Sequence, residues 1–166
     1  VRPMGRVSSG VKGIGLREDD EVVDMVVVSS PDSQLMTICE NGYGKRTDQD
    51  EYPRKHRGGM GVLDIKTTDR NGPVVACKEV MGDDEVLIVT QDGVLIRTEV
   101  GGISTVGRNT QGVRVINLGE GDRVIDMTRV PKSDDETEVD EAVSEGGEGA
   151  ADGASEGAQA PPEESE

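Results

Sequence analysis

The sequence predicts an all-β fold built as an array of four-stranded units. A segment recurs three times at a spacing of 51 residues, as Gly5–Leu16, His56–Thr67 and Gly107–Leu118. Two pairs of short β-type runs are each joined by Asn-Gly or Asp-Gly, and no stretch keeps the 3.6-residue apolar period of a helix. Four-stranded units of this length are typical of the blades of a propeller-like ring.

Four residue types keep the step of 51 in all three copies of the repeated segment. A shared phase across four residue types, without insertions, indicates one supersecondary unit repeated along the chain. Because valine and isoleucine are apolar, we expect those of the set to lie in the core. The phase-locked residues are Arg6, Arg57 and Arg108; Gly10, Gly61 and Gly112; Val11, Val62 and Val113; and Ile14, Ile65 and Ile116.

Each repeated segment is followed by a second apolar run. In the first unit this is Val22–Val28, directly after the acidic turn Arg17–Glu21. Its counterparts are Pro73–Ala76 one step later and Val124–Met127 two steps later. A short continuous run of β-branched residues is consistent with a buried strand, which is our expectation for Val22–Val28.

A hairpin completes the unit. Two short β runs separated by Asn-Gly or Asp-Gly are the strongest short-range hairpin signal, and they predict a type I′ turn with positive φ at both turn residues. No third such hairpin follows Val130, so we expect an incomplete ring whose missing strands come from upstream sequence. The two hairpins are Gln34–Glu40 with Tyr43–Thr47 around Asn41-Gly42, and Glu85–Gln91 with Val94–Thr98 around Asp92-Gly93.

The formal charge of −16 describes mainly the end of the chain. All 18 Lys and Arg and 21 of the 34 acids precede residue 133, so residues 1–132 carry −3 and residues 133–166 carry −13. The C-terminal segment is rich in Glu, Asp, Gly, Ala, Ser and Pro and cannot offset the entropy of ordering. We therefore expect a β domain at 1–131 and a disordered acidic tail at 132–166. The acidic average does not argue against a nucleic-acid partner.

Several classes of protein are disfavoured. No apolar run approaches the roughly 20 residues of a membrane span. The sequence has no P-loop, no nucleophile beside a base and no paired carboxylates beside a histidine, so we expect no enzymatic chemistry in this segment by itself. Cys39 and Cys77 stand singly and are expected to be free, buried thiols.

Basic residues gather near the repeated segment and the hairpin ends. At a fixed angular step they would form a curved positive track for the DNA backbone, which binds cations whatever its sequence. Glycines such as Gly58 could bring backbone N–H groups close to phosphates. Alternatively, the arginines form a solvated rim, or the ring docks a protein, although aromatic residues are scarce for that role. The candidate DNA-binding residues are Arg6, Lys12, Lys45, Arg46, Arg54, Lys55, Arg57, Arg97, Arg108 and Arg114.

Four motifs resemble the C-terminal domain of the DNA gyrase A subunit. They are RPMGR at Arg2–Arg6, ENGYGKRT at Glu40–Thr47, DGVLIRT at Asp92–Thr98 and GRNTQGV at Gly107–Val113. The resemblance implies that residues 1–131 are the last blades of a six-bladed β-pinwheel, whose basic perimeter wraps double-stranded DNA. The family's basic QRRGGKG box is matched only in part by Lys55–Gly61, where His56 and Met60 replace basic residues.

The resemblance also implies a larger assembly. Upstream would lie the strand-passage core of the same subunit, and the B subunit would complete an A2B2 enzyme that uses ATP and Mg²⁺ to supercoil DNA negatively in the bacterial cytoplasm, at the nucleoid. The catalytic tyrosine and the ATP and Mg²⁺ sites have no matching positions here, so no cofactor is expected in this segment, and no membrane partner. A near alternative is the homologous subunit of topoisomerase IV; the regular phase and the acidic end favour gyrase.

Overall fold

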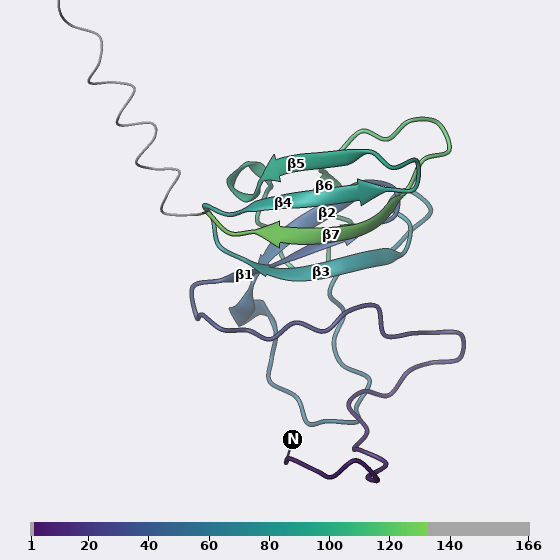
Figure 1. Ribbon diagram of the computed structural model, residues 1–166, viewed down its shortest axis with the longest axis vertical. Coiled ribbons are helices and arrows are strands. Elements are labelled where there is room, and N and C mark those ends of the chain that lie inside the picture. Colours follow the sequence, from purple (N-terminus) through teal and green to yellow (C-terminus); the bar gives the residue numbers. More distant parts are fainter. Residues whose placement is uncertain (1, 133–166) are drawn as a thin grey trace, which may run out of the picture. The chain divides into compact units, whose positions relative to one another are not determined.

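The computed structural model describes residues 2–132, so the predicted tail lies outside the described residues apart from Lys132. The described part is all-β, as predicted, with two single-turn 3₁₀ helices and no α-helix (Figure 1). None of its helices is long and apolar enough to cross a bilayer. The elements are β1 (Gln34–Cys39), β2 (Tyr43–Asp48), η1 (Gln49–Glu51), β3 (Val74–Val80), β4 (Glu85–Thr90), β5 (Leu95–Glu99), η2 (Val100–Gly102), β6 (Val113–Arg114) and β7 (Val124–Val130).

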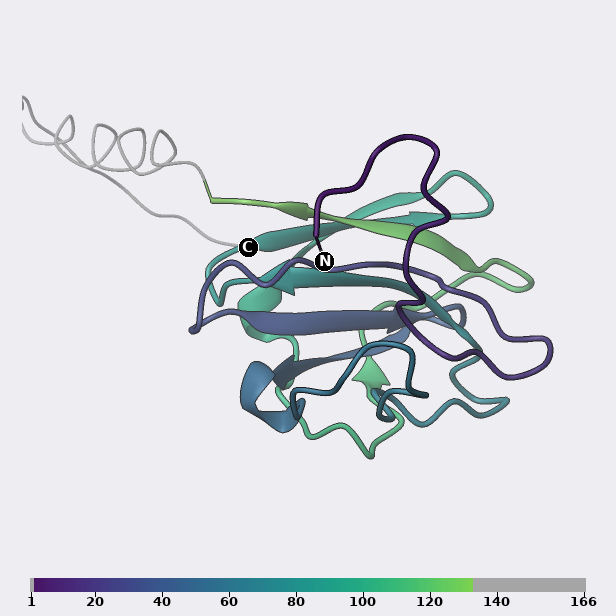
Figure 2. The same cartoon turned by 90° about the horizontal axis from the view of Figure 1, so that it is seen from below.

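Two antiparallel sheets contain these strands, in the orders β3-β1-β2-β6 and β5-β4-β7 (Figure 2). The four-stranded sheet takes the β1-β2 hairpin from one repeat, β3 from the next and β6 from the one after. In the second sheet β7 pairs with β4 in the same way as β3 pairs with β1 in the first. Both pairs have a register shift at equivalent positions near the hairpin turn. The predicted four-stranded unit therefore exists, but its strands come from three successive sequence repeats.

Both predicted hairpins are present, but the predicted type I′ turn is wrong. Only the glycine of each turn has positive φ, at 78° for Gly42 and 82° for Gly93. The amide of Gly42 donates to the carbonyl oxygen of Cys39 at 3.1 Å, and Gly93 repeats this bond to Thr90 at 3.0 Å. The first loop, residues 40–42, is one residue longer than predicted and the second, residues 91–94, is two longer, and each contains a single left-handed glycine.

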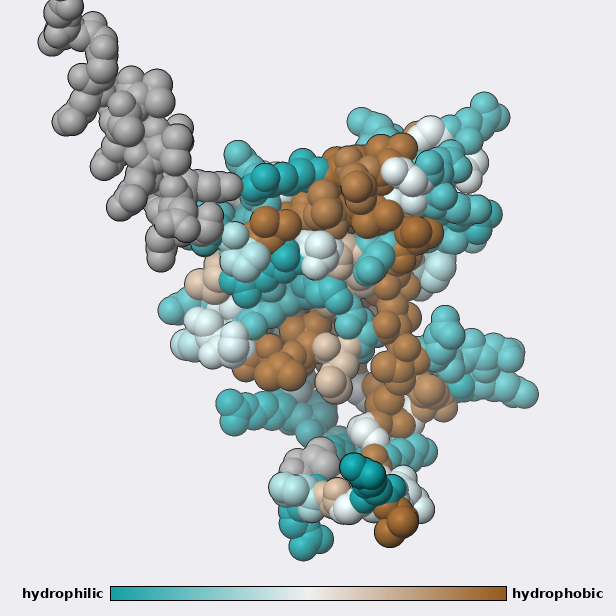
Figure 3. All heavy atoms as spheres, viewed as in Figure 1, coloured by the Kyte–Doolittle hydropathy of each residue, from teal (hydrophilic) through white to brown (hydrophobic). Residues whose placement is uncertain are grey.

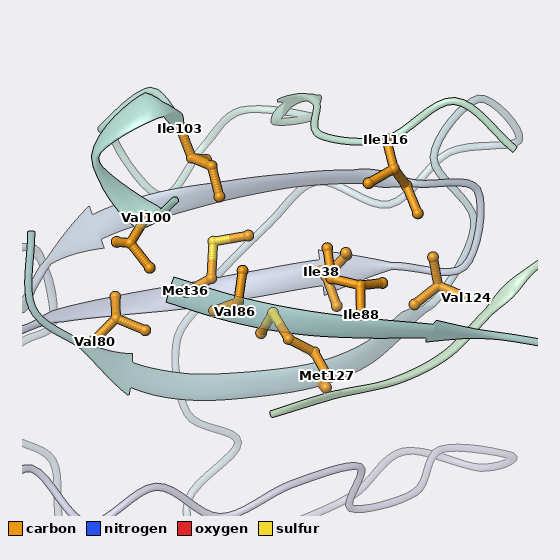
Figure 4. Packing of buried hydrophobic residues seen from close by; sticks show 11 residues of the cluster. Met36, Ile38, Val80, Val86, Ile88, Val100, Ile103, Ile116, Val124 and Met127 are labelled. Carbon is orange, nitrogen blue, oxygen red and sulfur yellow. The ribbon is translucent and has the colours of Figure 1, made fainter. Parts of the chain in front are cut away.

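The core lies between the two sheets (Figure 4). In β1 and β4 alternate apolar residues point into it, because side chains of a β-strand alternate between its faces. In β4 the buried apolar positions are Val86 and Ile88, and in β1 they include Met36 and Ile38. The remaining buried members are Ala76, Val80, Val100, Ile103, Ile116, Val124 and Met127. Aliphatic and Met side chains thus fill the interior without Phe or Trp.

The prediction that the phase-locked valines and isoleucines form the core holds for only part of the set. Ile65 and Ile116 are buried, and Val113 packs partly buried against the cluster. Val11, Ile14 and Val62 are exposed instead. These three belong to the first two copies of the repeated segment, which lie outside both sheets.

The prediction of a buried strand at Val22–Val28 is wrong. The segment forms no ladder, and Met25 and Val27 are 81% and 74% exposed. Its counterparts β3 and β7 each pair with a hairpin that precedes them, whereas no hairpin precedes Val22 among the described residues. Apolar surface is exposed elsewhere too: Figure 3 shows it over the β5-β4-β7 sheet, where Val94, Leu95 and Ile125 are exposed.

Candidate nucleic-acid interface

The three copies of the repeated segment are joined to one another by backbone hydrogen bonds. The amide of Gly15 donates to the carbonyl oxygen of Gly59 at 2.8 Å, and the amide of Lys66 donates to that of Thr110 at 2.8 Å. Donors and acceptors of these two bonds are each 51 residues apart. Since consecutive copies are linked at the same positions, equivalent residues recur in a row from copy to copy, which ends at the third copy, whose strand β6 lies among the sheet strands in Figure 1.

The arginines of this row differ in their surroundings. Arg6 and Arg57 are exposed, and among the described residues no carboxylate lies within 4 Å of either. Arg108 is half-buried and donates from its guanidinium to the carbonyl oxygen of Leu63 at 2.8 Å. Its guanidinium carbon also lies 5.8 Å from the ring centre of Tyr52. Arg108 therefore fastens the third copy to the second, while the other two arginines face solvent.

Three further candidates are also exposed, namely Lys12, Arg54 and Lys55. Lys12 lies against Gly58, since a Cβ at that glycine would be 3.9 Å from the Lys12 side chain. The amide of Gly58 donates to the carbonyl oxygen of Gly13 at 2.8 Å, so this glycine joins two motif copies and its N–H is not available to a phosphate. The fold thus brings Lys12 of the first motif next to Gly58 of the second.

The expectation that Lys45 contacts DNA is wrong, because its side chain is fully buried. Its ammonium donates to the carbonyl oxygen of Asp64 at 2.7 Å and to the hydroxyl of Thr47 at 2.8 Å. The carboxylate of Asp64 lies 3.6 Å away. Burial lowers the pKa of Lys45, although the Asp64 carboxylate opposes that shift. Lys45 is an internal cation of the four-stranded sheet.

Asp64 is the centre of this internal network, and sequence reasoning missed it. The hydroxyls of Tyr52 and Thr37 both donate to its carboxylate, the latter at 2.8 Å. Burial, followed by the bond to Asp64, raises the pKa of Tyr52 far above its usual value. The sequence contained one indication that Asp64 has a special role. Gly13 and Val115 occupy the equivalent positions of the other two copies, so an acid occurs only in the second copy.

Arg46 and Arg97 occupy equivalent positions in the two hairpins but make different contacts. Arg46 donates from Nε to the carbonyl oxygen of Ile103 at 2.6 Å and from its terminal nitrogens to Gln34 and Gly101 at 3.0 and 3.2 Å. Arg97 is exposed and forms an ion pair with Glu85. Arg46 therefore holds η2 against β2, and Arg97 is already offset by a neighbouring acid.

Arg114 forms a cluster with a second arginine that the sequence-based candidates did not include. It donates to the hydroxyl of Tyr43 at 2.7 Å, with its guanidinium carbon 5.2 Å from the ring centre. Arg70 lies over the same ring at 4.6 Å. Hydrogen bonds from Arg70 and then Arg114 lower the pKa of Tyr43. Arg70 lies outside the phase-locked positions, which is why the repeat gave no indication of it.

The two cysteines are free, as expected, but only Cys39 is fully buried, whereas Cys77 is half-buried. Burial raises the pKa of each thiol to about 11, so neither is a reactive thiolate at neutral pH. Over the described residues, no group of three or more His, Cys, Asp or Glu side chains is placed to hold a metal ion.

Comparisons with known proteins agree with the repeat and the fold. The family of the DNA gyrase C-terminal domain, a beta-propeller, matches residues 1–29, 33–80 and 84–131. The DNA gyrase A subunit of Salmonella typhimurium (strain LT2) is 46% identical over 151 residues, which cover 89% of this chain. The chain spans 17% of that protein's length.

Two solved structures are also similar. A structure of the DNA gyrase A C-terminal domain superposes with a TM-score of 0.72 at 31% identity, covering 78% of this chain and 44% of that one. The C-terminal domain of DNA topoisomerase IV gives a TM-score of 0.70, covering 83% of this chain and 43% of that one. Because the second identity is only 22%, that likeness concerns the fold alone.

Proposed function

Because this chain belongs to the family of DNA gyrase C-terminal domains, we propose that residues 1–131 bind and wrap duplex DNA as part of a gyrase A subunit. The observation that carries the proposal is the row of motif copies joined by a repeated backbone bond, with Arg6 and Arg57 exposed along it. Phosphates are regularly spaced charges, and a regular row of cations releases their counterions irrespective of base sequence.

The mechanism is electrostatic and geometric. Bending ~20–30 base pairs by 40–90° costs on the order of 1–6 kcal/mol, so several phosphate contacts must offset it. Five of the exposed candidates lie in or just before the first two motif copies and supply cations for this purpose, namely Arg6, Lys12, Arg54, Lys55 and Arg57. Arg108 and Arg46 instead hold the elements that carry the row, and Lys45 lies inside the fold.

The longer protein would place this segment in a type IIA topoisomerase. In that assembly an upstream core cleaves and passes DNA, a B subunit supplies ATP hydrolysis, and the present segment contributes no catalytic group. The site of action would be the nucleoid in the bacterial cytoplasm. A topoisomerase IV subunit is the alternative assignment; the 46% identity to a gyrase A subunit favours gyrase.

The test is the salt dependence of binding to duplexes of several sequences, measured by fluorescence anisotropy. We expect Arg6→Gln with Arg57→Gln to weaken binding similarly on every sequence. The slope of log K against log salt should flatten by about 0.9 for each phosphate that the variant no longer neutralises. An unchanged slope would remove both arginines from the interface.

A control variant distinguishes the effect of the motif arginines on DNA binding from the effect of net charge alone. The single variant Arg6→Gln is compared with Arg123→Gln, which removes the same charge from an exposed arginine that is paired with Glu40 at 3.0 Å. We expect that variant to change the slope little, since its guanidinium is already offset. Equal flattening by Arg123→Gln would show that total charge, and not the motif row, governs binding.

A further inference from the structure

Two guanidinium groups converge on one tyrosine in the four-stranded sheet. Their carbons lie 4.6 Å (Arg70) and 5.2 Å (Arg114) from the ring centre of Tyr43, and Arg114 also bonds its hydroxyl. Within the described residues no carboxylate lies within 4 Å of either guanidinium. Two like charges at one tyrosine ring repel each other, and a bound anion lowers that cost.

The backbone that carries Arg70 is firmly held. The next residue, Asn71, is fully buried and donates from its side-chain amide to the carbonyl oxygens of Lys66 and Gln111, both at 3.1 Å. Asn41 donates to the carbonyl oxygen of Arg70 itself at 3.3 Å. The turn therefore positions Arg70 before any ligand arrives.

Arg114 is held from the other side. It is the last residue of β6 and pairs directly with Tyr43 of β2, which fixes its backbone beside the ring. Its guanidinium donates to Asn117 at 3.1 Å in addition to the tyrosine hydroxyl. Planar guanidiniums with fixed backbones suit two-point recognition of a phosphate group.

The fold does not require this arrangement. In the next unit Val94 occupies the position equivalent to Tyr43, and Gly121 the position equivalent to Arg70. That hairpin forms without a tyrosine or an arginine at these positions. The lowered pKa of Tyr43 agrees with a strongly positive local field. The cationic pair is therefore specific to this unit and is not needed to form the hairpin.

We propose that Arg70 and Arg114, held by Tyr43, form a two-point receptor for a single phosphate group of the DNA backbone. This rests on the proposed function and deepens it, because it assigns one phosphate-binding position to a named pair outside the phase-locked arginines.

The first test keeps the charge and removes the geometry. In the full 166-residue chain, Arg70→Lys with Arg114→Lys retains both charges but loses the planar, two-point donors. We expect roughly tenfold weaker binding of a duplex in anisotropy titrations, from the loss of charge-assisted hydrogen bonds. The matched control is Arg17→Lys with Arg123→Lys, which should leave affinity unchanged. Unchanged affinity in the Arg70/Arg114 variant would overturn the receptor.

The second test uses inorganic phosphate and the ionisation of tyrosine. The chain has only two tyrosines and no tryptophan, and burial keeps Tyr52 neutral to very high pH, so the first phenolate absorbance reports Tyr43. We expect phosphate to raise the pKa of Tyr43, because the anion takes over the guanidinium hydrogen bonds. Chloride at equal ionic strength should produce a smaller shift. Equal shifts with the two anions would contradict the proposal.

The outcomes separate this inference from the proposed function. If the parent chain binds DNA and the lysine variant binds equally well, the receptor is wrong and the proposed function stands. If phosphate shifts Tyr43 but the parent chain does not bind DNA, the proposed function fails, and the pair is an anion site whose occupant is not DNA.

Discussion

A single carboxylate fastens the loop that precedes the first hairpin. Glu79 of β3 accepts hydrogen bonds from the amide and hydroxyl of Ser29, at 2.7 and 2.6 Å, and from the hydroxyl of Ser33 at 2.6 Å. The amide of Ser30 adds a fourth at 3.1 Å. These bonds, led by those from Ser29 and Ser33, lower the pKa of Glu79 from 4.5 to about 2.

The lowered pKa predicts how Glu79→Gln responds to pH. A carboxyl that is more acidic in the folded state adds stability above its unfolded pKa, and that contribution disappears as the pH falls through its folded pKa. We expect Glu79→Gln to lower the thermal midpoint at pH 7, with the gap to the parent closing between pH 4.5 and about 2. Circular dichroism melts of both chains measure this. A gap that stays constant down to pH 2 would contradict it.

Residue-level roles were only partly predictable from sequence. Strand alternation predicts that Lys45 and Arg46 of β2 face opposite sides. It does not predict which side is covered, because the covering groups, Asp64 and the carbonyl oxygen of Gly107, come from other repeats. The pairing of Arg70 with Tyr43 was hidden for the same reason, since 27 positions separate them in sequence.

At the scale of elements, the shortest strand joins the most distant repeats. Strand β6 has only two residues, yet it closes the four-stranded sheet against β2. The preceding glycine makes this approach possible: Gly112 has φ +74°, and a Cβ there would lie 2.6 Å from the carbonyl oxygen of Gly44. Gly10 and Gly61 have nearly the same φ, so the repeated glycine serves conformation.

Gly112→Ala should therefore detach β6. Left-handed strain alone costs about 1–3 kcal/mol for a non-glycine residue, and the clash with backbone adds to it. We expect a clear loss of stability in urea unfolding and faster hydrogen exchange at the Val115 amide, which donates to the carbonyl oxygen of Gly42 at 2.9 Å.

The control for this substitution is Gly119→Ala. Gly119 lies in open space, with nothing within 4 Å of its would-be Cβ and no left-handed φ. That change should be neutral or slightly stabilising, because alanine restricts the unfolded chain. Equal effects of the two substitutions would show that close approach to β2 does not limit position 112.

The elements were predictable where their signals are local. Both hairpins follow from a short turn between β-type runs, and β3, β4, β5 and β7 lie close to their predicted ranges. Strand β6 was not predictable, because its partner lies 70 residues earlier and no local pattern records that pairing. The prediction of a strand at Val22–Val28 was wrong for the opposite reason. The segment has the composition of a strand, but within the described residues no hairpin precedes it with which it could pair.

At the scale of the whole domain, the sequence repeat and the structural sheet are offset from each other. A sheet combines the hairpin of one repeat, the strand of the next and β6 from the third. Each hairpin therefore pairs with a strand that follows it in sequence, and the third repeated segment contributes β6 to the first hairpin. This accounts for the exposure of Val11 and Ile14 in the first copy, which have no hairpin before them among the described residues.

The acidic segment after Lys132 leads to the last prediction. Residues 133–166 carry −13, tethered to a domain whose exposed cations are proposed to bind DNA. A tethered polyanion acts at a high effective concentration and competes with phosphate for the same guanidiniums. The chain can be ended after Lys132 because residues 1–132 form a compact unit by themselves. This shortened chain should bind a duplex more tightly at low salt, since the competing negative charge has been removed. The gain should shrink as salt rises, since the Debye length falls to about 10 Å at 0.1 M and 3 Å at 1 M.

The matched control keeps all 34 residues but replaces their acids with Gln and Asn. If the negative charge of the tail is the cause, this control should bind DNA like the shortened chain. If excluded volume is the cause, it should bind like the parent chain. Equal affinity of all three chains would show that the tail does not compete with DNA.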